Sequence, residues 1–489
     1  MKDVVIVGGG LAGLSAAWRT RYYDNLVLES TERIGGRVRS ERRGEHWMNW
    51  GGHMYAGPGS ASDTLFNEVG INTVQIPGLL TGMSMNGKLL TKGSLATYPL
   101  RIPMPLSARV GTFAVGAKIL SSLVFKYLKV VRARPGESPA ERQQRIFDFE
   151  NNRSFRDFIG KNVPHDAQAL FEVTVTRVCG ELDQISAGQG IGYFTMVLGS
   201  GSGLYRYIVG GPSTLTTSMA AALGDRVQTG AEVHEVVKKT DSVLVRYRQD
   251  GTDREVEART AILAPTASVA HRIGVDLPTE LRDALGQIKY GPHVVSSFLT
   301  NETEPRPWDD VYCIAAPKKS FSIATNNSNI IRGSEKERTP GGSFMVFSPG
   351  DKGRALFDKS DEEVARIHQA DLDDVLGHGF ADSVVDAGVS RWAEGSPYCF
   401  PGRGKIQQTL MRGASRVFLA GDYLGSLATE TSIATGLQAG QNVLSLLGTE
   451  HQARRVPNVS ARAALQTQAS DFAQDSASAA RRSPALSVD

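Results

Sequence analysis

Residues 3–13 read DVVIVGGGLAG, a short apolar run followed at once by glycines. The β-branched run predicts a buried parallel strand, and the residues after the glycines have the composition of a helix. A G-x-G-x-x-G spacing between a strand and a helix is typical of dinucleotide binding. Gly8 allows the tight turn, Gly10 lets backbone approach a pyrophosphate, and Gly13 lets the helix pack on the strand.

A second strand and an acidic residue follow this helix. We expect the helix to begin at Leu11 and Ala12 and to direct free N–H groups at phosphates. Residues 25–28 read NLVL and lead to Glu29, sixteen residues beyond the last glycine of the motif. A carboxylate at this place can accept both ribose hydroxyls of an adenosine, and Ser30 is predicted to lie beside it.

A Gly-Gly-Arg sequence comes next and separates this pattern from a simple NAD-binding motif. Gly35 and Gly36 can pass close under a pyrophosphate, and Arg37 can neutralise its charge. The run V-L-E-x-x-x-R-x-G-G-R resembles the start of the FAD-dependent amine oxidase superfamily. That superfamily includes monoamine and polyamine oxidases, protoporphyrinogen oxidases and phytoene-desaturase-type enzymes.

Residues near the C-terminus resemble the second half of the same FAD signature. A strand at residues 416–420 ends in Gly421 and Asp422, and a helix is predicted to start near Thr431 with its positive end at the flavin. The resemblance implies bound FAD and adds further cofactor-binding residues, namely Gly51, Gly52, His53, Met54, Val233, Glu430, Thr431, Ser432 and Ile433.

The resemblance implies an α/β fold, α+β overall, in two parts. A Rossmann-like FAD domain of the glutathione-reductase type is expected at residues 1–60, 205–285 and 400–448. A substrate domain of mixed antiparallel sheet and helices is expected to be inserted at residues 61–204 and 286–399. Residues 449–489 lack an apolar period and are predicted to be a disordered tail.

Two departures from the family pattern bear on the reaction. Most amine oxidases of the superfamily carry a lysine on the strand that here contains Val295 and Ser296, and they frame the amine with two aromatic side chains. No lysine lies at these positions, and one expected aromatic position holds Ala428. The other aromatic is Tyr398 or Phe400, and Tyr398 is expected to face the substrate.

These departures favour an FAD-dependent enzyme that desaturates a CH–CH bond of a mostly apolar, cyclic molecule such as a ring ketone or acid. Hydride would pass to flavin N5, and O2 would reoxidise the flavin. His53 or a tyrosine such as Tyr398 is predicted to act as the base. The alternatives are oxidation of an amine to an imine with release of H2O2, and a non-redox flavin isomerase or mutase.

The composition of the chain argues against some classes of partner. A formal charge of +3 without interleaved basic and aromatic residues argues against nucleic acid, and no metal site is predicted. Three widely separated cysteines and the absence of a signal peptide favour the cytoplasm. Residues 106–132 predict an apolar helix interrupted by cations, for which we expect one solvated face; membrane association is the less favoured alternative. A homo-oligomer is compatible with these features.

Overall fold

The computed structural model describes residues 1–77, 81–93, 95–197, 204–332, 338–426 and 428–455. Residues Met1–Val443 form one compact unit, which contains both large sheets. The second unit, Leu444–Asp489, is described only as far as the end of helix α18 (Ala428–Arg455). Residues 449–455 are therefore helical where the sequence predicts the tail to begin, and the rest of that tail lies outside the described residues.

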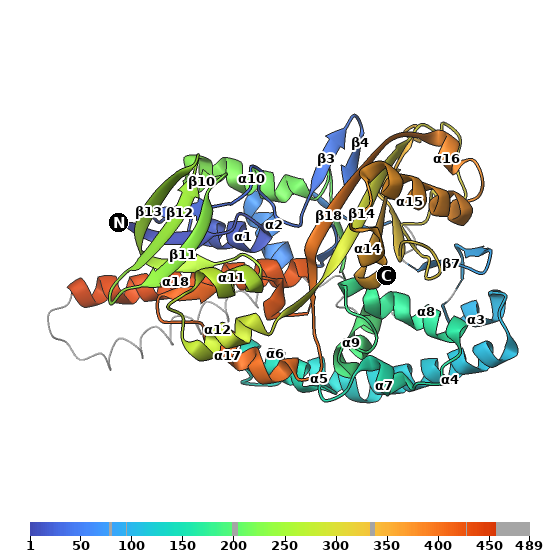
Figure 1. Cartoon of the computed structure of the whole chain (residues 1–489), viewed down its shortest axis with the longest axis horizontal. Helices are drawn as coiled ribbons and strands as arrows, with labels where there is room; N and C mark the ends of the chain where they lie inside the picture. Colours follow the sequence, from blue (N-terminus) through green and yellow to red (C-terminus); the bar gives the residue numbers. More distant parts are fainter. Residues whose placement is uncertain (78–80, 94, 198–203, 333–337, 427, 456–489) are drawn as a thin grey trace, which may run out of the picture. The chain divides into compact units, whose positions relative to one another are not determined.

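The first large sheet is built on the predicted N-terminal strand (Figure 1). Five of its strands run parallel, in the order β10, β2, β1, β13, β19, and two more add to β13 as an antiparallel meander. The strands come from three separate stretches of chain: β1 (Lys2–Val7), β2 (Asn25–Leu28), β10 (Val227–Gln228), β11 (Glu232–Lys238), β12 (Val243–Gln249), β13 (Thr252–Leu263) and β19 (Val417–Leu419).

Short apolar runs explain the parallel part, because residues 4–7 of β1 and 26–28 of β2 are all apolar and buried. Helix α1 (Leu11–Arg19) follows β1 directly, and nearly all of its residues are buried. The helices associated with this sheet in the chain are α10 (Ser213–Leu223), α11 (Ala267–Ile273), α12 (Thr279–Gly286), α17 (Gln407–Arg412) and α18.

The second large sheet is almost wholly antiparallel and contains the two longest neighbouring strands in Figure 1, β14 and β18. Its order is β18 (Val384–Tyr398), β14 (Lys289–Thr300), β17 (Gly342–Pro349), β16 (Ile323–Asn326), β15 (Cys313–Ala315), β7 (Gly82–Met85) and β8 (Lys88–Leu90). Helices α13 (Ser328–Arg332), α14 (Gly350–Leu356), α15 (Asp361–Leu376) and α16 (Phe380–Ser383) accompany it.

Two small sheets connect these parts of the fold. They are the hairpin of β3 (Ser40–Arg43) and β4 (His46–Asn49), and the sheet of β5 (Tyr55–Ala56), β9 (Leu204–Ile208) and β6 (Thr73–Gln75). With a parallel Rossmann-like sheet, an antiparallel sheet and helices, the predicted α/β and α+β fold class is confirmed.

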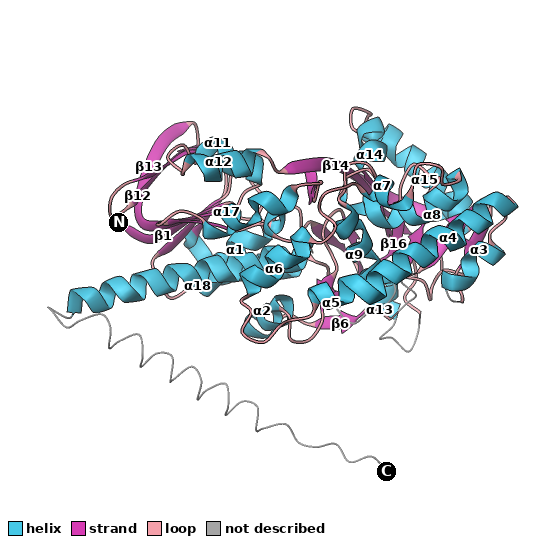
Figure 2. Cartoon of the chain, turned by 90° about the horizontal axis from the view of Figure 1, so that it is seen from below, coloured by secondary structure: helices cyan, strands magenta, loops and turns pink. Residues whose placement is uncertain are grey.

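A helical layer is formed mainly by residues 98–197, where α4 lies beside α7 and α8 (Figure 2). Aromatic and β-branched side chains such as Phe155, Phe158 and Ile191 form its core. The helices are α3 (Tyr98–Arg101), α4 (Leu106–Ser122), α5 (Leu128–Val131), α6 (Pro139–Asp148), α7 (Phe155–Ile159), α8 (His165–Val175) and α9 (Ala187–Val197). Helix α2 (Ala61–Val69) contacts α10 and β5 instead.

The predicted apolar helix at residues 106–132 is present as α4, a π-helical turn at Leu123–Tyr127, and α5. Within the described residues, this run alone is long and apolar enough to cross a membrane, on length and composition only. One face of this run is exposed, as expected, but it carries several large apolar side chains, namely Leu106, Val110, Phe113, Leu120, Val124 and Phe125.

Candidate active site

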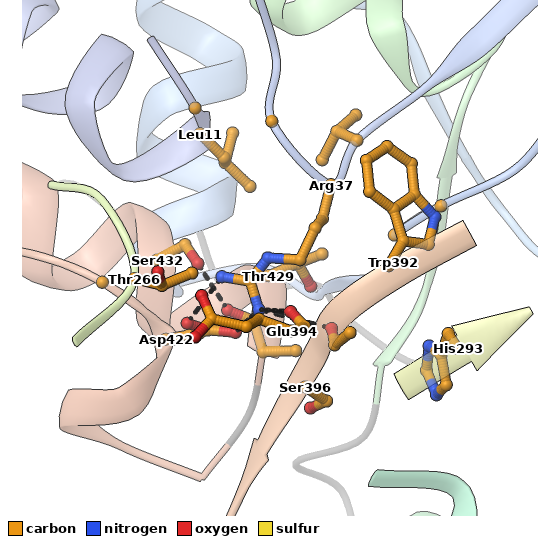
Figure 3. Close-up of a pocket in the computed structure, with 18 of the residues that line it drawn as sticks. Leu11, Arg37, Thr266, His293, Trp392, Glu394, Ser396, Asp422, Thr429 and Ser432 are labelled. Carbon is orange, nitrogen blue, oxygen red and sulfur yellow. Dashed lines mark hydrogen bonds and ion pairs between the residues drawn. The ribbon is translucent and has the colours of Figure 1, made fainter. Parts of the chain in front are cut away.

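A cavity of about 640 Å³ extends from the loop after β1 to the second large sheet. Its walls come from segments that are far apart in the sequence, as the close-up in Figure 3 shows for Leu11, Arg37, His293 and Asp422. Most of the predicted cofactor-binding residues line it: Gly8, Gly10, Leu11, Ala12, Glu29, Ser30, Gly35, Gly36, Arg37, Gly51, Gly52, His53, Met54, Val233, Gly421, Asp422 and Ser432.

The glycine loop holds α1 against β1. A Cβ added to Gly13 would lie 1.9 Å from the carbonyl oxygen of Gly8, so any larger residue would separate helix from strand. Gly13 does not line the cavity and has this packing role instead. Gly10 precedes the helix without a capping side chain, so the first N–H groups of α1 are left for a ligand.

Glu29 marks one end of the cavity. Its Oε2 accepts a 2.7 Å hydrogen bond from the N–H of Gly9, and its Oε1 accepts one of 3.0 Å from the N–H of Thr31. These bonds hold the carboxylate at the end of β2, where the sequence predicts a ribose site. Val233, predicted to lie at the adenine, lines the cavity as well.

Arg37 and Asp422 join the first and last parts of the chain (Figure 3). Two hydrogen bonds of 2.8 and 2.9 Å run from the guanidinium to the two carboxylate oxygens. Burial opposes the charge of Arg37, but Asp422 outweighs this effect and the pKa of Arg37 is raised. Arg37 was predicted to neutralise a pyrophosphate; the structure instead shows its charge matched by Asp422 at the cavity wall.

These residues fit an FAD. A Cβ on Gly10 would meet only the Cα of Gly36, at 3.8 Å, so the space beside this backbone is open to a ligand. The carboxylate of Glu29 suits a ribose, and the unpaired N–H groups at the start of α1 suit a pyrophosphate. Gly51 and Gly52 also line the cavity, and the N–H of Gly52 donates a hydrogen bond to the carbonyl of Arg37.

The start of α18 differs from the prediction. The helix begins at Ala428, and Ala428, Thr429 and Ser432 line the cavity, whereas Thr431 and Ile433 do not. Glu430 turns the other way, and its carboxylate accepts hydrogen bonds from the N–H groups of residues 61 and 62 at the start of α2. Glu430, Thr431 and Ile433 were predicted to bind cofactor, and we reassign them to packing and helix capping.

His53 has little freedom to act as a base. Its Nδ1 lies 2.8 Å from the carbonyl oxygen of Gly51, which can only accept, so Nδ1 carries the proton and Nε2 a lone pair. Nε2 is enclosed and has no hydrogen-bond partner among the described residues. Burial lowers the pKa of His53 to about 4. The side chain lines the cavity as predicted, but this geometry does not favour proton abstraction by it.

Tyr398 is not among the residues that line the cavity. Its ring packs on the helical core, where a Cβ on Gly180 would meet it at 2.7 Å. The prediction that Tyr398 faces the substrate is therefore wrong. The strand carries its cavity residues earlier, at positions 391–396, and β18 reaches Tyr398 only at its far end.

The wall opposite the glycine loops defines a substrate end of the cavity. It is formed by the second sheet and the helical layer and is largely apolar, with Val295 facing the cavity at the strand where family members carry a lysine. No lysine lines the cavity within the described residues. The residues of the substrate end are Arg177, Val178, Tyr193, Met196, His293, Val295, Cys313, Ile323, Thr325, Met345 and Phe347.

Several residues that line the cavity were not found from the sequence. Residues 391–396 of β18 all line the cavity, so the alternation typical of a strand does not mark them; Figure 3 shows Trp392, Glu394 and Ser396 following one another on this strand. Arg177 gives no local signal either, because it lies in a short turn of residues 176–178 that only the tertiary fold brings to the cavity.

Comparisons with known proteins identify the family of this chain. A family model described as flavin containing amine oxidoreductase matches residues 11–444. Amine oxidase [flavin-containing] A of Canis lupus familiaris is 25% identical over 310 residues, 60% of this chain and 55% of that protein. The chain thus spans about half the length of this relative. The same enzyme of Sus scrofa is 23% identical over 485 residues, 92% of this chain and 86% of that protein.

Solved structures share the fold. Cyclohexylamine oxidase from Brevibacterium oxydans IH-35A has a TM-score of 0.72 at 18% identity, and putrescine oxidase bound to putrescine has one of 0.70 at 19%. Both similarities cover 91% of this chain and 99% of the other. A candidate protoporphyrinogen oxidase from Exiguobacterium sp. 255-15 has a TM-score of 0.67 at 16% identity, with the same coverage.

Proposed function

The chain belongs to the family of flavin-containing amine oxidoreductases, with FAD as its cofactor, and we propose that it dehydrogenates a CH–CH bond of a small, mostly apolar ring compound. The observation that carries the proposal is the substrate end of the cavity. The resemblance implies a lysine near Val295 and Ser296 and an aromatic residue near Ala428, whereas Val295 and Ala428 line the cavity and no lysine does within the described residues.

When bound, FAD supplies the acceptance of two electrons from the substrate. The residues of the chain position the substrate and exclude water from it. Val295, Met345 and Phe347 present apolar surface to an apolar substrate, and burying such surface contributes roughly 25 cal/mol per Å². Two hydrogen bonds fix the wall that faces this substrate end. The N–H of Gly52, next to Gly51, donates to the carbonyl of Arg37, and the hydroxyl of Thr429 donates to the carbonyl of Met54.

Oxidation of an amine is the second candidate, and the names of the relatives and of two structural neighbours favour it. The products separate the two reactions. Desaturation removes two hydrogen atoms from carbon and releases no nitrogen, while O2 becomes H2O2. Oxidation of a primary amine gives an imine that hydrolyses to ammonia and a carbonyl compound.

Product analysis is the test. The holoenzyme is incubated in air with alicyclic ketones, acids and amines, and H2O2, ammonia and product mass are measured. We expect H2O2 together with a product two mass units lighter than its substrate and no ammonia. Ammonia in equal amount to H2O2, with no desaturated product, would overturn the proposal in favour of amine oxidation.

A further inference from the structure

A partly buried cation stands at the substrate end without a counter-ion among the described residues. Arg177 lines the cavity from the turn between α8 and Cys179. Its Nε donates a 3.1 Å hydrogen bond to the carbonyl of Thr174, but neither terminal nitrogen has an acceptor among the described residues, and Nη2 is enclosed. An unpaired guanidinium in a largely apolar wall is costly, and such groups gather at functional sites.

The neighbours of Arg177 do not neutralise it. The ionisable groups that would raise the pKa of Arg177 are Cys313 and Tyr193, but burial has the larger effect and the pKa is lowered. Burial raises the pKa of Cys313 to about 11 and that of Tyr193 well above its usual value, so both are neutral at pH 7. His293 directs its Nε2 at the carbonyl oxygen of Arg177, at 3.2 Å, and thereby holds the turn against β14 without adding negative charge.

The acids that line the cavity are engaged elsewhere. Glu29 accepts from backbone N–H groups at the ribose end, and Asp422 pairs with Arg37. Glu394 accepts a hydrogen bond from the hydroxyl of Ser268. Glu232 lies next to Val233, at the predicted adenine site. None of them forms an ion pair with Arg177 in the described part of the chain.

We infer that Arg177 binds a carboxylate of the substrate. A carboxylate would accept from the free terminal nitrogens and balance this charge, whereas an ammonium group would be repelled from the same place. This inference rests on the proposed function, because the ligand occupies the same cavity. The inference narrows the expected substrates to ring compounds with a carboxylate and argues against diamines as substrates.

Three probes with one ring test it: cyclohexanecarboxylate, cyclohexanecarboxamide and cyclohexanemethylamine. Each is titrated into the holoenzyme without O2, and binding is followed by the shift in flavin visible absorption. We expect the carboxylate to bind at least about tenfold more tightly than either other probe, as hydrogen bonds to a charged group predict. Arg177→Met should abolish this preference, and Arg177→Lys should keep part of it.

Lys161→Met is the matched control, since Lys161 is an exposed cation of the same helical layer and should leave the preference intact. The inference would be overturned if the unaltered enzyme bound all three probes equally or preferred the amine. This measurement requires no variant. If the carboxylate is preferred but no ring acid yields a desaturated product, the inference stands while the proposed reaction fails.

A second inference rests on a different surface. Leu106, Val110, Phe113, Leu120 and Val124 follow a spacing of three, four or seven residues and lie on one face of α4 and the π-helical turn. Their side chains are 42–73% exposed. The opposite face, with Val115 and Ile119, packs into the helical core. The helix is therefore apolar on both faces, and one of them is uncovered.

The charge of the surrounding sequence indicates which partner would cover this exposed face of α4. Residues 69–136 contain nine Lys and Arg and no Asp or Glu, although the whole chain of 489 residues holds 51 acids. A second copy of this chain meeting the same face would bring like charges together. We propose that this face docks on a lipid surface with anionic headgroups, with its apolar side chains at the acyl boundary.

Sedimentation with vesicles tests this docking. The full-length holoenzyme should bind phosphatidylcholine vesicles that contain phosphatidylglycerol, bind pure phosphatidylcholine less, and lose affinity as salt is raised. The double variant Phe113→Ser with Phe125→Ser should bind the vesicles at least about tenfold more weakly. The control Val385→Ser, at an exposed apolar residue of β18, should bind as the unaltered protein does. Absence of binding to both vesicles, or a dimer in solution that the double variant abolishes, would overturn the proposal.

Discussion

Glu29 shows how one side chain can organise a cofactor site. Its two carboxylate oxygens accept from Gly9 N–H and Thr31 N–H, so the group that should receive the ribose also fixes the glycine loop. The sequence predicts this residue because a carboxylate at the end of the second strand has a direct chemical purpose. Its position depends only on neighbouring elements.

We predict that Glu29→Gln weakens FAD binding by roughly ten- to one hundredfold, because hydrogen bonds to a charged acceptor contribute about 1.5–3 kcal/mol. The dissociation constant is measured by titrating apoprotein with FAD. Glu32→Gln, at an exposed acid three residues away, is the control and should bind FAD normally. An unchanged dissociation constant in Glu29→Gln would show that the carboxylate does not serve the cofactor.

His368 is a buried group whose titration should be visible in stability. Burial lowers its pKa to about 4, and both ring nitrogens lie close to serine hydroxyls, those of Ser296 at 2.7 Å and Ser348 at 2.9 Å. An exposed histidine in the unfolded chain titrates near 6.5. The unfolded state therefore binds more protons between pH 4 and 6.5, and stability is lost as pH falls through this range.

We predict that the free energy of unfolding falls more steeply in the unaltered protein than in His368→Asn between pH 6.5 and 5. The difference should approach about 1.4 kcal/mol per pH unit, the effect of one proton. Denaturant unfolding at several pH values measures it. Parallel pH curves for the two proteins would contradict this prediction, because they would mean that His368 binds its proton at the same pH in the folded and the unfolded state.

Tyr398, His53 and Arg177 show where residue-scale prediction stops. Tyr398 was placed at the substrate from its position in a motif, yet its ring packs on the helical core beside Gly180. Whether Nε2 of His53 is enclosed depends on side chains from other elements. Arg177 reaches the cavity through the tertiary packing of a short turn. None of these outcomes leaves a local pattern in the sequence.

At the scale of elements, the start of α18 carries the main correction. Glu430 caps α2, since its carboxylate accepts from Ala61 N–H at 2.8 Å and Ser62 N–H at 3.1 Å. A carboxylate at a helix N-terminus is favourable both as an acceptor and through the helix dipole. The sequence predicts this helix correctly but not which of its sides faces the flavin.

We predict that Glu430→Ala lowers the free energy of unfolding by about 1–2 kcal/mol, the usual cost of losing a cap, while FAD binds within a few-fold of normal. Thermal unfolding and FAD titration measure the two effects. Glu68 is unsuitable as a control because it pairs with Arg21, so Glu304→Ala, at an exposed acid of the loop after β14, takes that place. A large loss of FAD affinity with unchanged stability would restore the cofactor role.

At the scale of the whole molecule, the site exists only because three stretches of chain meet. Arg37 comes from the first stretch and Asp422 from the last, and their paired hydrogen bonds of 2.8 and 2.9 Å close the cavity wall. The fold class and the FAD motifs could be predicted from the sequence, since both rest on local glycine, strand and helix patterns. The Arg37–Asp422 pair could not, because it joins residues 385 positions apart.

We predict that Asp422→Asn destabilises the holoenzyme by about 2 kcal/mol and hastens loss of FAD. Breaking a buried pair leaves a charge unpaired, but partial exposure of Arg37 reduces the cost. Asp24→Asn, which breaks the exposed pair with Lys2, is the control and should cost less than about 1 kcal/mol. Equal effects of the two substitutions would contradict a special role for the Arg37–Asp422 pair.

Anaerobic bleaching of the flavin's visible absorption tests the central claim most directly. The holoenzyme is mixed without O2 with a panel of alicyclic ketones and acids and, separately, with a panel of amines. We expect members of the first panel to bleach the flavin and the amines to leave it oxidised, because the substrate end lacks the lysine and carries the unpaired cation Arg177. Bleaching by amines alone would contradict desaturation and return the enzyme to oxidation of CH–NH bonds.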